Sequence, residues 1–295
     1  MSTIHSLAFV DPRAELGRDV EIGPFAHVGA DVVLGDRCVL HARATVLGPS
    51  SFGAGNVFFP GCVLGAAPQD LKFKGGPTRL DVGERNIFRE LVTVHRGTEV
   101  DRHSAGVTKI GNRNLFMVAA HIAHDSIIDN HIIIANSVQM AGHVHIQDYV
   151  NVGGASGMHH FVTVGRNAFV GGMTRVTHDV PPYMKVQGYD GQVRGINAEG
   201  MRRWKIPAES IAAVKGAFRL LYARRGGQAP GRTTEALREI ESNGLCNDEH
   251  VAYLVAFLKR KLEVGVYGRV REHDRTDTAN DRKGFYQSEP KEPSG

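Results

Sequence analysis

The sequence has 295 residues, of which 42% are hydrophobic and 22% charged, and its formal net charge is +4. This balance is typical of a globular protein, and so small a basic excess disfavours a nucleic-acid-binding protein. No apolar run reaches the roughly 18 residues of a membrane span, and the first residues lack the basic and apolar regions of a signal peptide. The cysteines, Cys38, Cys62 and Cys246, form no metal or disulfide pattern, so we expect a reduced, cytoplasmic setting.

Apolar residues recur at every sixth position over two long stretches of the chain. The first series is Val10, Leu16, Ile22, Val28, Leu34, Leu40, Val46, Phe52, Phe58 and Leu64. The second is Ile110, Phe116, Ile122, Ile128, Ile134, Met140, Ile146, Val152, Met158, Val164, Val170 and Val176, and a partial bridge at Val82, Phe88 and Val94 joins them. A period of six matches neither the ~3.6 residues of a helical turn nor the ~2 residues of a strand. It indicates short strands joined by turns, three of which close a triangular coil of about 18 residues that pairs in parallel with the next coil.

Two segments interrupt the repeat, near 66–81 and 99–107. Both are rich in glycine or charged residues, and the first also contains two prolines. Because insertions in a solenoid leave it as surface loops, commonly at a binding face, we expect these loops to border the functional site. The repeat ends near residues 178–182, so we assign the coiled domain to residues 1–188.

A helical domain is predicted over residues 189–268. One helix begins near Pro207, keeps helical apolar spacing through Ile211, Val214 and Phe218, and stops at residues 224–227. A last helix, capped by Asn247, has the apolar face Val251, Leu254, Val255, Leu258 and Leu262. From residue 269 to 295 apolar residues are nearly absent, so we expect a disordered tail.

Basic residues are concentrated between residues 201 and 225. They are Arg202, Arg203, Lys205, Lys215, Arg219, Arg224 and Arg225, against the single acid Glu209. Such a patch would attract an acidic partner protein, although an ordinary solvated helix face is the alternative interpretation.

Histidines gather in the second repeat series. A coil of about 18 residues places His124, Gly142, His160 and His178 in one column and Asp125 and His143 in the next. A histidine beside a carboxylate and near exposed backbone N–H groups is suited to acyl transfer, and a polar ladder on a solvated face is the alternative. No GxSxG motif and no cysteine accompany the cluster, which disfavours a covalent nucleophile. His160 and His178 are close enough to share zinc, whereas His124 and His160, two coils apart at roughly 9–10 Å, are not.

Six motifs carry a more specific signal. They are PQDLKF (68–73), VTVHRGT (92–98), AHIAHDS (120–126), MAGHVHI (140–146), DVPPY (179–183) and INAEGMRR (196–203). In this order they resemble the UDP-N-acetylglucosamine O-acyltransferases of lipid A biosynthesis. The resemblance implies a mainly β fold, a left-handed parallel β-helix with a C-terminal α-helical domain, and a homotrimer with its sites in clefts between subunits.

The reaction that the resemblance implies is transfer of an (R)-3-hydroxyacyl group from acyl carrier protein to the 3-hydroxyl of UDP-N-acetylglucosamine. It needs no cofactor beyond the phosphopantetheine on the donor protein, and no metal. His124 resembles the general base, Asp125 the residue that orients it, and the N–H of Gly142 the oxyanion donor. Residues that resemble substrate contacts are Asp70, Lys72, His95, His121, His143, His160, Asn197, Glu199 and Arg203, and Gly172 matches a position that leaves the acyl channel open.

Three positions depart from the family pattern. His160 replaces the glutamine of an HQF motif, Trp204 replaces a basic residue, and Asp190 stands where the family tends to carry histidine. A different UDP-sugar therefore stays open as the acceptor. Two further hypotheses are a zinc-dependent hydratase resembling γ-type carbonic anhydrase and a non-catalytic trimeric scaffold.

Overall fold

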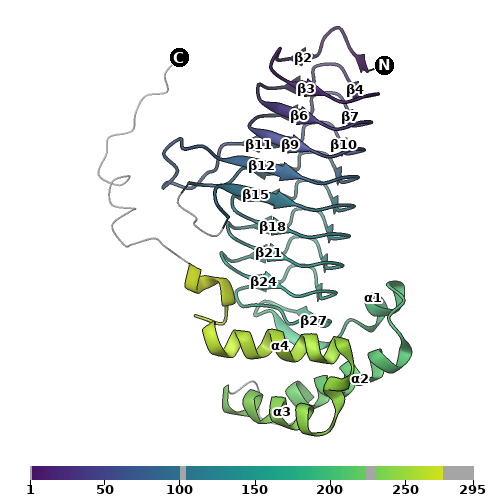
Figure 1. Cartoon of the computed structure of the whole chain (residues 1–295), viewed down its shortest axis with the longest axis vertical. Helices are drawn as coiled ribbons and strands as arrows, with labels where there is room; N and C mark the ends of the chain where they lie inside the picture. Colours follow the sequence, from purple (N-terminus) through teal and green to yellow (C-terminus); the bar gives the residue numbers. More distant parts are fainter. Residues whose placement is uncertain (1, 100–103, 224–229, 275–295) are drawn as a thin grey trace.

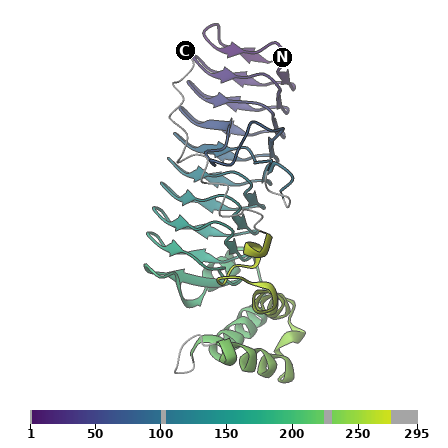
Figure 2. The same ribbon diagram turned by 90° about the vertical axis from the view of Figure 1, so that its left-hand side faces the viewer.

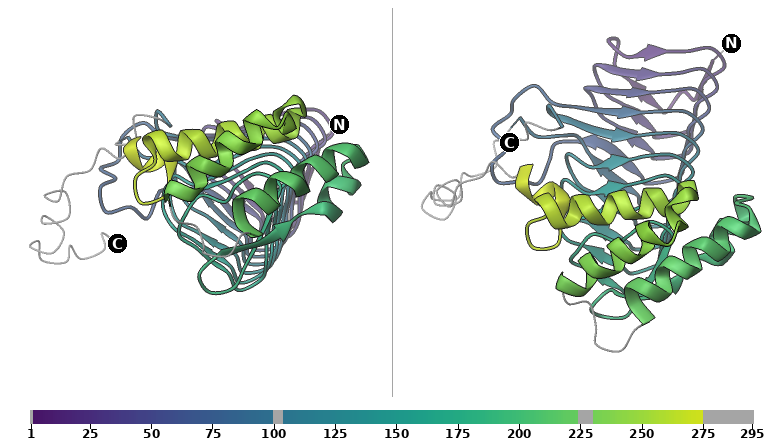
Figure 3. Two further views of the ribbon diagram at one scale, coloured as in Figure 1. Left: turned by 90° about the horizontal axis from the view of Figure 1, so that it is seen from below. Right: turned by 60° about the horizontal axis from the view of Figure 1, so that its bottom comes forward.

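The computed structural model describes residues 2–99, 104–223 and 230–274. Its main body is a prism of stacked three-sided coils, with the helices gathered at one end (Figure 1). Seen from below, the prism has a triangular outline, as the repeat predicted (Figure 3). Each side of the triangle is a sheet whose stacked strands pair in parallel, except for one antiparallel strand at the helical end, and we name the three sides faces A, B and C.

Face A is formed by β1 (Thr3–Ile4), β4 (Glu21–Ile22), β7 (Val39–Leu40), β10 (Val57–Phe58), β13 (Ile87–Phe88), β16 (Leu115–Phe116), β19 (Ile133–Ile134), β22 (Asn151–Val152), β25 (Phe169–Val170), β27 (Met184–Gln187) and β28 (Gln192–Ile196). Face B is formed by β2 (Phe9–Val10), β5 (His27–Val28), β8 (Thr45–Val46), β11 (Val63–Ala66), β14 (Thr93–His95), β17 (His121–Ile122), β20 (Gln139–Met140), β23 (Gly157–Met158) and β26 (Arg175–Val176). Face C is formed by β3 (Glu15–Leu16), β6 (Val32–Leu34), β9 (Ser50–Phe52), β12 (Arg79–Val82), β15 (Val107–Ile110), β18 (Ile127–Ile128), β21 (His145–Ile146) and β24 (Thr163–Val164).

The repeat positions form the interior of the prism. Every residue of both predicted series is buried except Val10 and Leu16, which are half-buried in the first coil. The bridging residues Val82, Phe88 and Val94 are buried as well. The interior side chains stack from coil to coil, as the parallel rings of Phe88 and Phe116, 5.0 Å apart, illustrate.

The pairing register shows where the two insertions lie. In a regular coil Ile133 pairs with Asn151, eighteen residues later. Val57 instead pairs with Ile87, thirty residues later, and Ile87 with Leu115, twenty-eight residues later. The extra residues form two loops, between β11 and β12 and between β14 and β15, and both leave the prism on the same side (Figure 1).

That side is the corner between faces B and C, which we call corner BC, and whose turns include 123–126 and 141–144. The turn residues Asp125 and His143 have φ values of 59° and 63°, in the left-handed region. This conformation is costly for most residues but is best tolerated by short polar side chains such as Asp, which can hydrogen-bond locally. It aims these side chains outward at the place where the two loops emerge.

The helical end consists of α1 (Ala198–Arg203), α2 (Ala208–Phe218), the π-helical turn η1 (Arg219–Ala223), α3 (Pro230–Ser242), the 3₁₀ turn η2 (Leu245–Asn247), α4 (Glu249–Val264) and the 3₁₀ turn η3 (Val270–Asp274). A second apolar core, with Val214, Leu237 and Leu254 at its centre, packs against Tyr183 and Met184 at the last coil. Figure 2 shows these helices beneath the stack of coils.

Several local expectations for this end were wrong. Asp248, not Asn247, caps α4, because its carboxylate accepts the N–H groups of His250 and Val251. The predicted helical region also contains a strand, β28. This strand forms a hairpin with β27, and the hairpin crosses the domain boundary that was predicted at residue 188. Helices α1 and α3 were not predicted. Arg224 and Arg225 of the basic patch lie outside the described residues.

The tail expected to be disordered from residue 269 begins with an ordered segment. Arg269, Val270, Arg271 and Glu272 are each 6–7% exposed; the first three have hydrogen-bond partners on the prism, and Glu272 pairs with Arg269. Residues 275–295 lie outside the described part of the chain. In the part that is described, no helix combines the length and apolar character needed to cross a membrane.

Candidate active site

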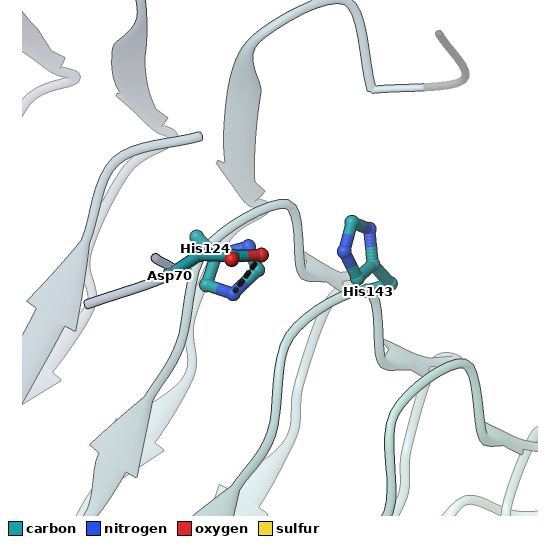
Figure 4. A group of neighbouring side chains, drawn as sticks. All are labelled: Asp70, His124 and His143. Atoms are coloured by element: carbon teal, nitrogen blue, oxygen red, sulfur yellow. Dashed lines mark ion pairs between the residues drawn. The ribbon is translucent and has the colours of Figure 1, made fainter. Parts of the chain in front are cut away.

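His124 and Asp125 form a tight pair at corner BC. His124 Nδ1 lies 2.7 Å from Asp125 Oδ2. Because an ionised carboxylate can only accept, Nδ1 carries the proton and the lone pair of Nε2 is directed away from Asp125. Nε2 lies 3.7 Å from Asp70 Oδ2, which the first inserted loop brings over the ring (Figure 4).

Asp125 is fully buried and held from several sides. Its carboxylate accepts the backbone N–H of Thr98 at 2.9 Å and the hydroxyls of Thr98 at 2.7 Å and Ser104 at 2.6 Å. Its own N–H donates to the hydroxyl of Thr108 at 2.8 Å. Together these donors satisfy the buried carboxylate and prevent it from turning away from His124.

Gly142 lies directly against the His124 ring, one coil further along. A Cβ atom built on Gly142 would lie 2.4 Å from His124 Cε1, so any side chain there would displace the ring. The column predicted from the repeat is therefore present at this point. Among the described residues, the Gly142 N–H has no hydrogen-bond acceptor within the chain.

His143, the next corner residue, braces His124 from the side. The two rings meet edge to face with centroids 5.0 Å apart, and the His143 ring stacks on Phe161 at 4.4 Å. His143 Nδ1 lies 3.9 Å from Asp125 Oδ2, too far for a hydrogen bond.

These residues open onto a groove of about 880 Å³ along face B. The predicted site residues that line it are Asp70, Lys72, His95, His121, His124, Gly142, His143 and His160. The predicted side chains, which come from the first inserted loop and from several coils, therefore share one cavity.

His95 and His121 are neutral members of this groove. Burial, reinforced by the charges of neighbouring histidines, lowers the pKa of His95 to about 4. Burial likewise lowers the pKa of His121, whose Nδ1 lies 2.7 Å from the Thr93 hydroxyl. Both can therefore donate and accept hydrogen bonds near neutral pH without carrying charge.

A second set of predicted residues lies elsewhere on the chain. Asn197, Glu199 and Arg203 line a groove of about 590 Å³ on face A, together with Trp204. Gly172 is exposed in a turn between faces A and B. Within one chain, this set is not part of the groove that contains His124.

Sequence reasoning missed several residues around the pair. Thr98 belongs to the VTVHRGT motif, Ser104 follows in the second loop and Thr108 lies on β15, but nothing in their spacing indicated that they bind Asp125. Phe161 is adjacent to His160, and its role as a platform for His143 depends on the eighteen-residue coil.

One group in the described residues has the arrangement of a metal site. Asp70, His124 and His143 each offer a ligand atom, and these atoms lie within 4.8 Å of one another. Figure 4 shows the three side chains around the same space. This set differs from the His160 and His178 pair that the sequence suggested.

Comparisons with known proteins agree with one another. Residues 179–266 match a family model described as UDP-N-acetylglucosamine O-acyltransferase, domain 2, and residues 13–48 match the bacterial transferase hexapeptide model. An acyl-[acyl-carrier-protein]–UDP-N-acetylglucosamine O-acyltransferase of Verminephrobacter eiseniae is 42% identical over 88% of this chain and 97% of its own length. A protein of the same name from Synechocystis is 48% identical over 60% of this chain and 63% of its own length.

A solved structure gives the same result. The crystal structure of LpxA, a UDP-N-acetylglucosamine acyltransferase from Bacteroides fragilis, has a TM-score of 0.81 and 37% identity, covering 87% of this chain and 97% of that one. The expected fold class, a left-handed parallel β-helix with a C-terminal helical domain, is confirmed.

Proposed function

The chain belongs to the UDP-N-acetylglucosamine O-acyltransferase family, and from this premise we propose how its side chains transfer an acyl group from acyl carrier protein to UDP-N-acetylglucosamine in lipid A biosynthesis. The observation that carries the proposal is the His124–Asp125 pair, whose Nδ1 is held by the carboxylate while Nε2 faces the groove beside Gly142.

His124 acts as the general base. Its Nε2 accepts the proton of the sugar 3-hydroxyl while that oxygen attacks the thioester carbonyl of an (R)-3-hydroxyacyl donor. The carbonyl oxygen gains negative charge, which the N–H of Gly142 stabilises. When the tetrahedral intermediate collapses, the C–S bond breaks, the phosphopantetheine sulfur leaves, and the proton held by His124 passes to it. The products are the sugar ester and the free thiol of the carrier.

The remaining groove residues position the acceptor. Asp70, close to Nε2, accepts a sugar hydroxyl, and Lys72 offers a point charge to a phosphate. His95, His121, His143 and His160 supply further hydrogen bonds. The reaction requires no cofactor or metal from the chain itself, because the phosphopantetheine arm belongs to the donor.

A homotrimer would unite the two sets of site residues. In this arrangement Gly172, Asn197, Glu199 and Arg203 of one subunit face His124 of its neighbour. Exposed apolar side chains support it: the turns between faces A and B present Leu7, Phe25, Leu91 and Met173, and Ile87 and Ile133 are exposed on face A. A ridge of this kind is typical of a surface that packs against another copy.

The acyl donor would meet the basic surface of the helical end. Arg202, Arg203, Lys205, Lys215 and Arg219 are all exposed there, which favours an acidic carrier protein. Cys38 and Cys62 are free and buried, in agreement with a cytoplasmic location. The identity of the acceptor sugar needs a direct test, because Trp204, His160 and Asp190 depart from the family pattern.

The decisive experiment compares two histidines that each pair with a carboxylate. We expect His124→Ala to lower kcat by roughly 10²- to 10⁴-fold, because the base is lost, while the thermal midpoint changes little. His145→Ala is the matched control, since His145 Nε2 lies 3.1 Å from Asp129 on face C, and it should retain full activity. Equal activity of both variants, assayed by mass spectrometry with several UDP-sugars, would exclude the proposed base.

A zinc-dependent hydratase is the second candidate, favoured by the Asp70, His124 and His143 group. Carboxylate-oriented histidines are common zinc ligands. Metal analysis of the purified protein separates the two functions: stoichiometric zinc, with hydration of carbon dioxide lost on chelation, would support the hydratase, whereas acyl transfer unaffected by chelation supports the acyltransferase.

A further inference from the structure

The chain continues past α4 into a short segment that folds back along corner BC. We call residues 266–274 the C-terminal strap. Val266 and Arg269 form an antiparallel bridge around a turn, and η3 follows. The match to the family model ends at residue 266, so the strap lies beyond it except for its first residue.

The strap is anchored to the last coil by several hydrogen bonds. Asp179 Oδ2 accepts the N–H of Val270 at 2.7 Å, and the N–H of Asp179 donates to the carbonyl of Gly268 at 2.9 Å. The Arg269 guanidinium donates to the carbonyl of Thr177 at 2.7 Å. Gly268 has φ +72° and lies so close to His178 that a Cβ atom would be 2.5 Å from its ring. The turn therefore requires glycine for both its conformation and its space.

From these anchors the strap reaches the catalytic corner. Arg271 Nη1 donates to the backbone carbonyl of His143 at 2.7 Å, and its side chain is buried. His143 directly follows Gly142, and its ring lies against His124. A residue 128 positions away along the chain thus holds the turn that carries the proposed oxyanion donor.

The turn also bonds to the coils on either side of it. The N–H of His143 donates to the carbonyl of His124 on the preceding coil at 3.0 Å. On the side of the following coil, the N–H of Phe161 donates to the carbonyl of Gly142 over a longer distance of 3.4 Å, and hydrogen bonds weaken with length. The bond from Arg271 to the His143 carbonyl therefore adds a tether to a turn whose contact with the following coil is long.

We propose that Arg271 is a positioning residue, which fixes the Gly142–His143 turn against His124 and so keeps the Gly142 N–H directed at the developing oxyanion. The inference rests on the proposed function of His124 and Gly142. Arg271 does not touch the substrate. Its effect falls on the transition state, because the oxyanion forms only there.

Two substitutions test this role in the full-length chain. Arg271→Met should lower kcat about tenfold or more, with the KM for the UDP-sugar nearly unchanged, when assayed well below the thermal midpoint of the variant. Arg271→Lys retains a cationic donor that can reach the same carbonyl, and it should recover most of the lost kcat.

The outcomes are separable. A lower thermal midpoint with unchanged kcat in Arg271→Met would reduce the strap to a structural role and overturn the proposal, as would a lysine variant no more active than the methionine variant. His124→Ala is measured in parallel: if it remains active, the proposed base has failed, whereas an inactive His124→Ala beside a fully active Arg271→Met refutes the strap alone.

Discussion

Asp125 shows how much of this site depends on a single buried carboxylate. It is fully buried, yet it accepts hydrogen bonds from Thr98, Ser104 and His124. Those donors offset its desolvation and leave it one orientation. Asp125 thus links the second inserted loop to the proposed base, so that the ordering of this loop and catalysis are coupled.

The first prediction replaces this carboxylate by its amide. Asp125→Asn places an NH₂ group opposite the hydrogen-bond donors that now surround the carboxylate. His124 therefore loses its orientation, and at least one buried hydrogen bond is lost. We expect kcat to fall by roughly 10²- to 10⁴-fold and unfolding free energy to fall by about 1–3 kcal/mol, measured by transfer assay and urea denaturation. Asp129→Asn, at the partly exposed pair with His145, is the control and should change stability by less than about 1 kcal/mol. Similar effects in both variants would contradict the account of Asp125.

The second prediction concerns pH. His95 has a pKa of about 4 when folded, against an ordinary value of 6.5. As pH falls from 6.5 towards 4, His95 becomes protonated in the unfolded chain but stays neutral in the folded chain. The free energy of unfolding therefore decreases across this pH range. His95→Asn removes that contribution. Its thermal midpoint should therefore drop less than that of the wild type between about pH 7.5 and about pH 5. An equal drop in both proteins would show that His95 does not contribute, while the lowered pKa of His121 leaves some acid sensitivity in either case.

At the scale of elements, the strands of the two lengthened coils must stay in register although their loops add residues between them. A buried ladder of Asn56, Asn86 and Asn114 spans them: Asn86 donates to Asn56 Oδ1 at 3.0 Å and accepts the N–H of Asn114 at 2.9 Å. Because the Asn86 side chain binds both the coil before it and the coil after it, the ladder keeps successive coils aligned where loops of different length leave the prism.

The third prediction follows from this ladder. Asn86→Ala leaves the N–H of Asn114 and the carbonyl of Gly111 without their partner inside the prism. We expect a loss of about 1–3 kcal/mol of unfolding free energy in urea. Asn112→Ala, in a solvent-exposed ladder one coil further along, is the matched control and should cost less than about 1 kcal/mol, because water replaces the bonds that its side chain makes to Glu84 and Asn130. The explanation fails if the two alanine variants unfold alike.

Periodicity in the sequence was sufficient to place most of these elements. The six-residue step identified the interior side chains, and the eighteen-residue coil placed Gly142 beside His124, since both depend only on local geometry repeated many times. The helical end lacks such repetition. There the cap of α4 was assigned to Asn247 in place of Asp248, because two adjacent polar residues are equally good caps when only spacing is known.

At the scale of the whole molecule, the predicted site residues divide between two grooves. His124 and its neighbours lie on face B, whereas Asn197, Glu199 and Arg203 lie on face A. No periodicity argument could foresee this division, because it depends on which side of the prism the chain follows as it leaves the last coil. The strap was missed for a related reason: its polar composition suggests disorder until its partners on the prism are known.

The fourth prediction tests whether a neighbouring subunit completes the site. His124→Ala and Arg203→Ala should each be nearly inactive when pure. When the two are co-expressed in equal amounts, about a quarter of the sites in random trimers combine an intact His124 with an intact Arg203, so specific activity should recover to roughly that fraction. A mixture as inactive as its components would place both residues in one subunit's site, and light scattering must show the same oligomer in all samples.

The stacking interval has a consequence for genetics. Since the residue beneath a given side chain is encoded eighteen codons further on, compensating changes for a defective position should arise at that interval, as between 124 and 142. Across the looped coils the interval becomes twenty-eight or thirty, so revertants of a change at Asn86 should map to 56 or 114. Among related genes, the residues at these paired positions should covary. The spacing of the covarying pairs would then show the length of each coil.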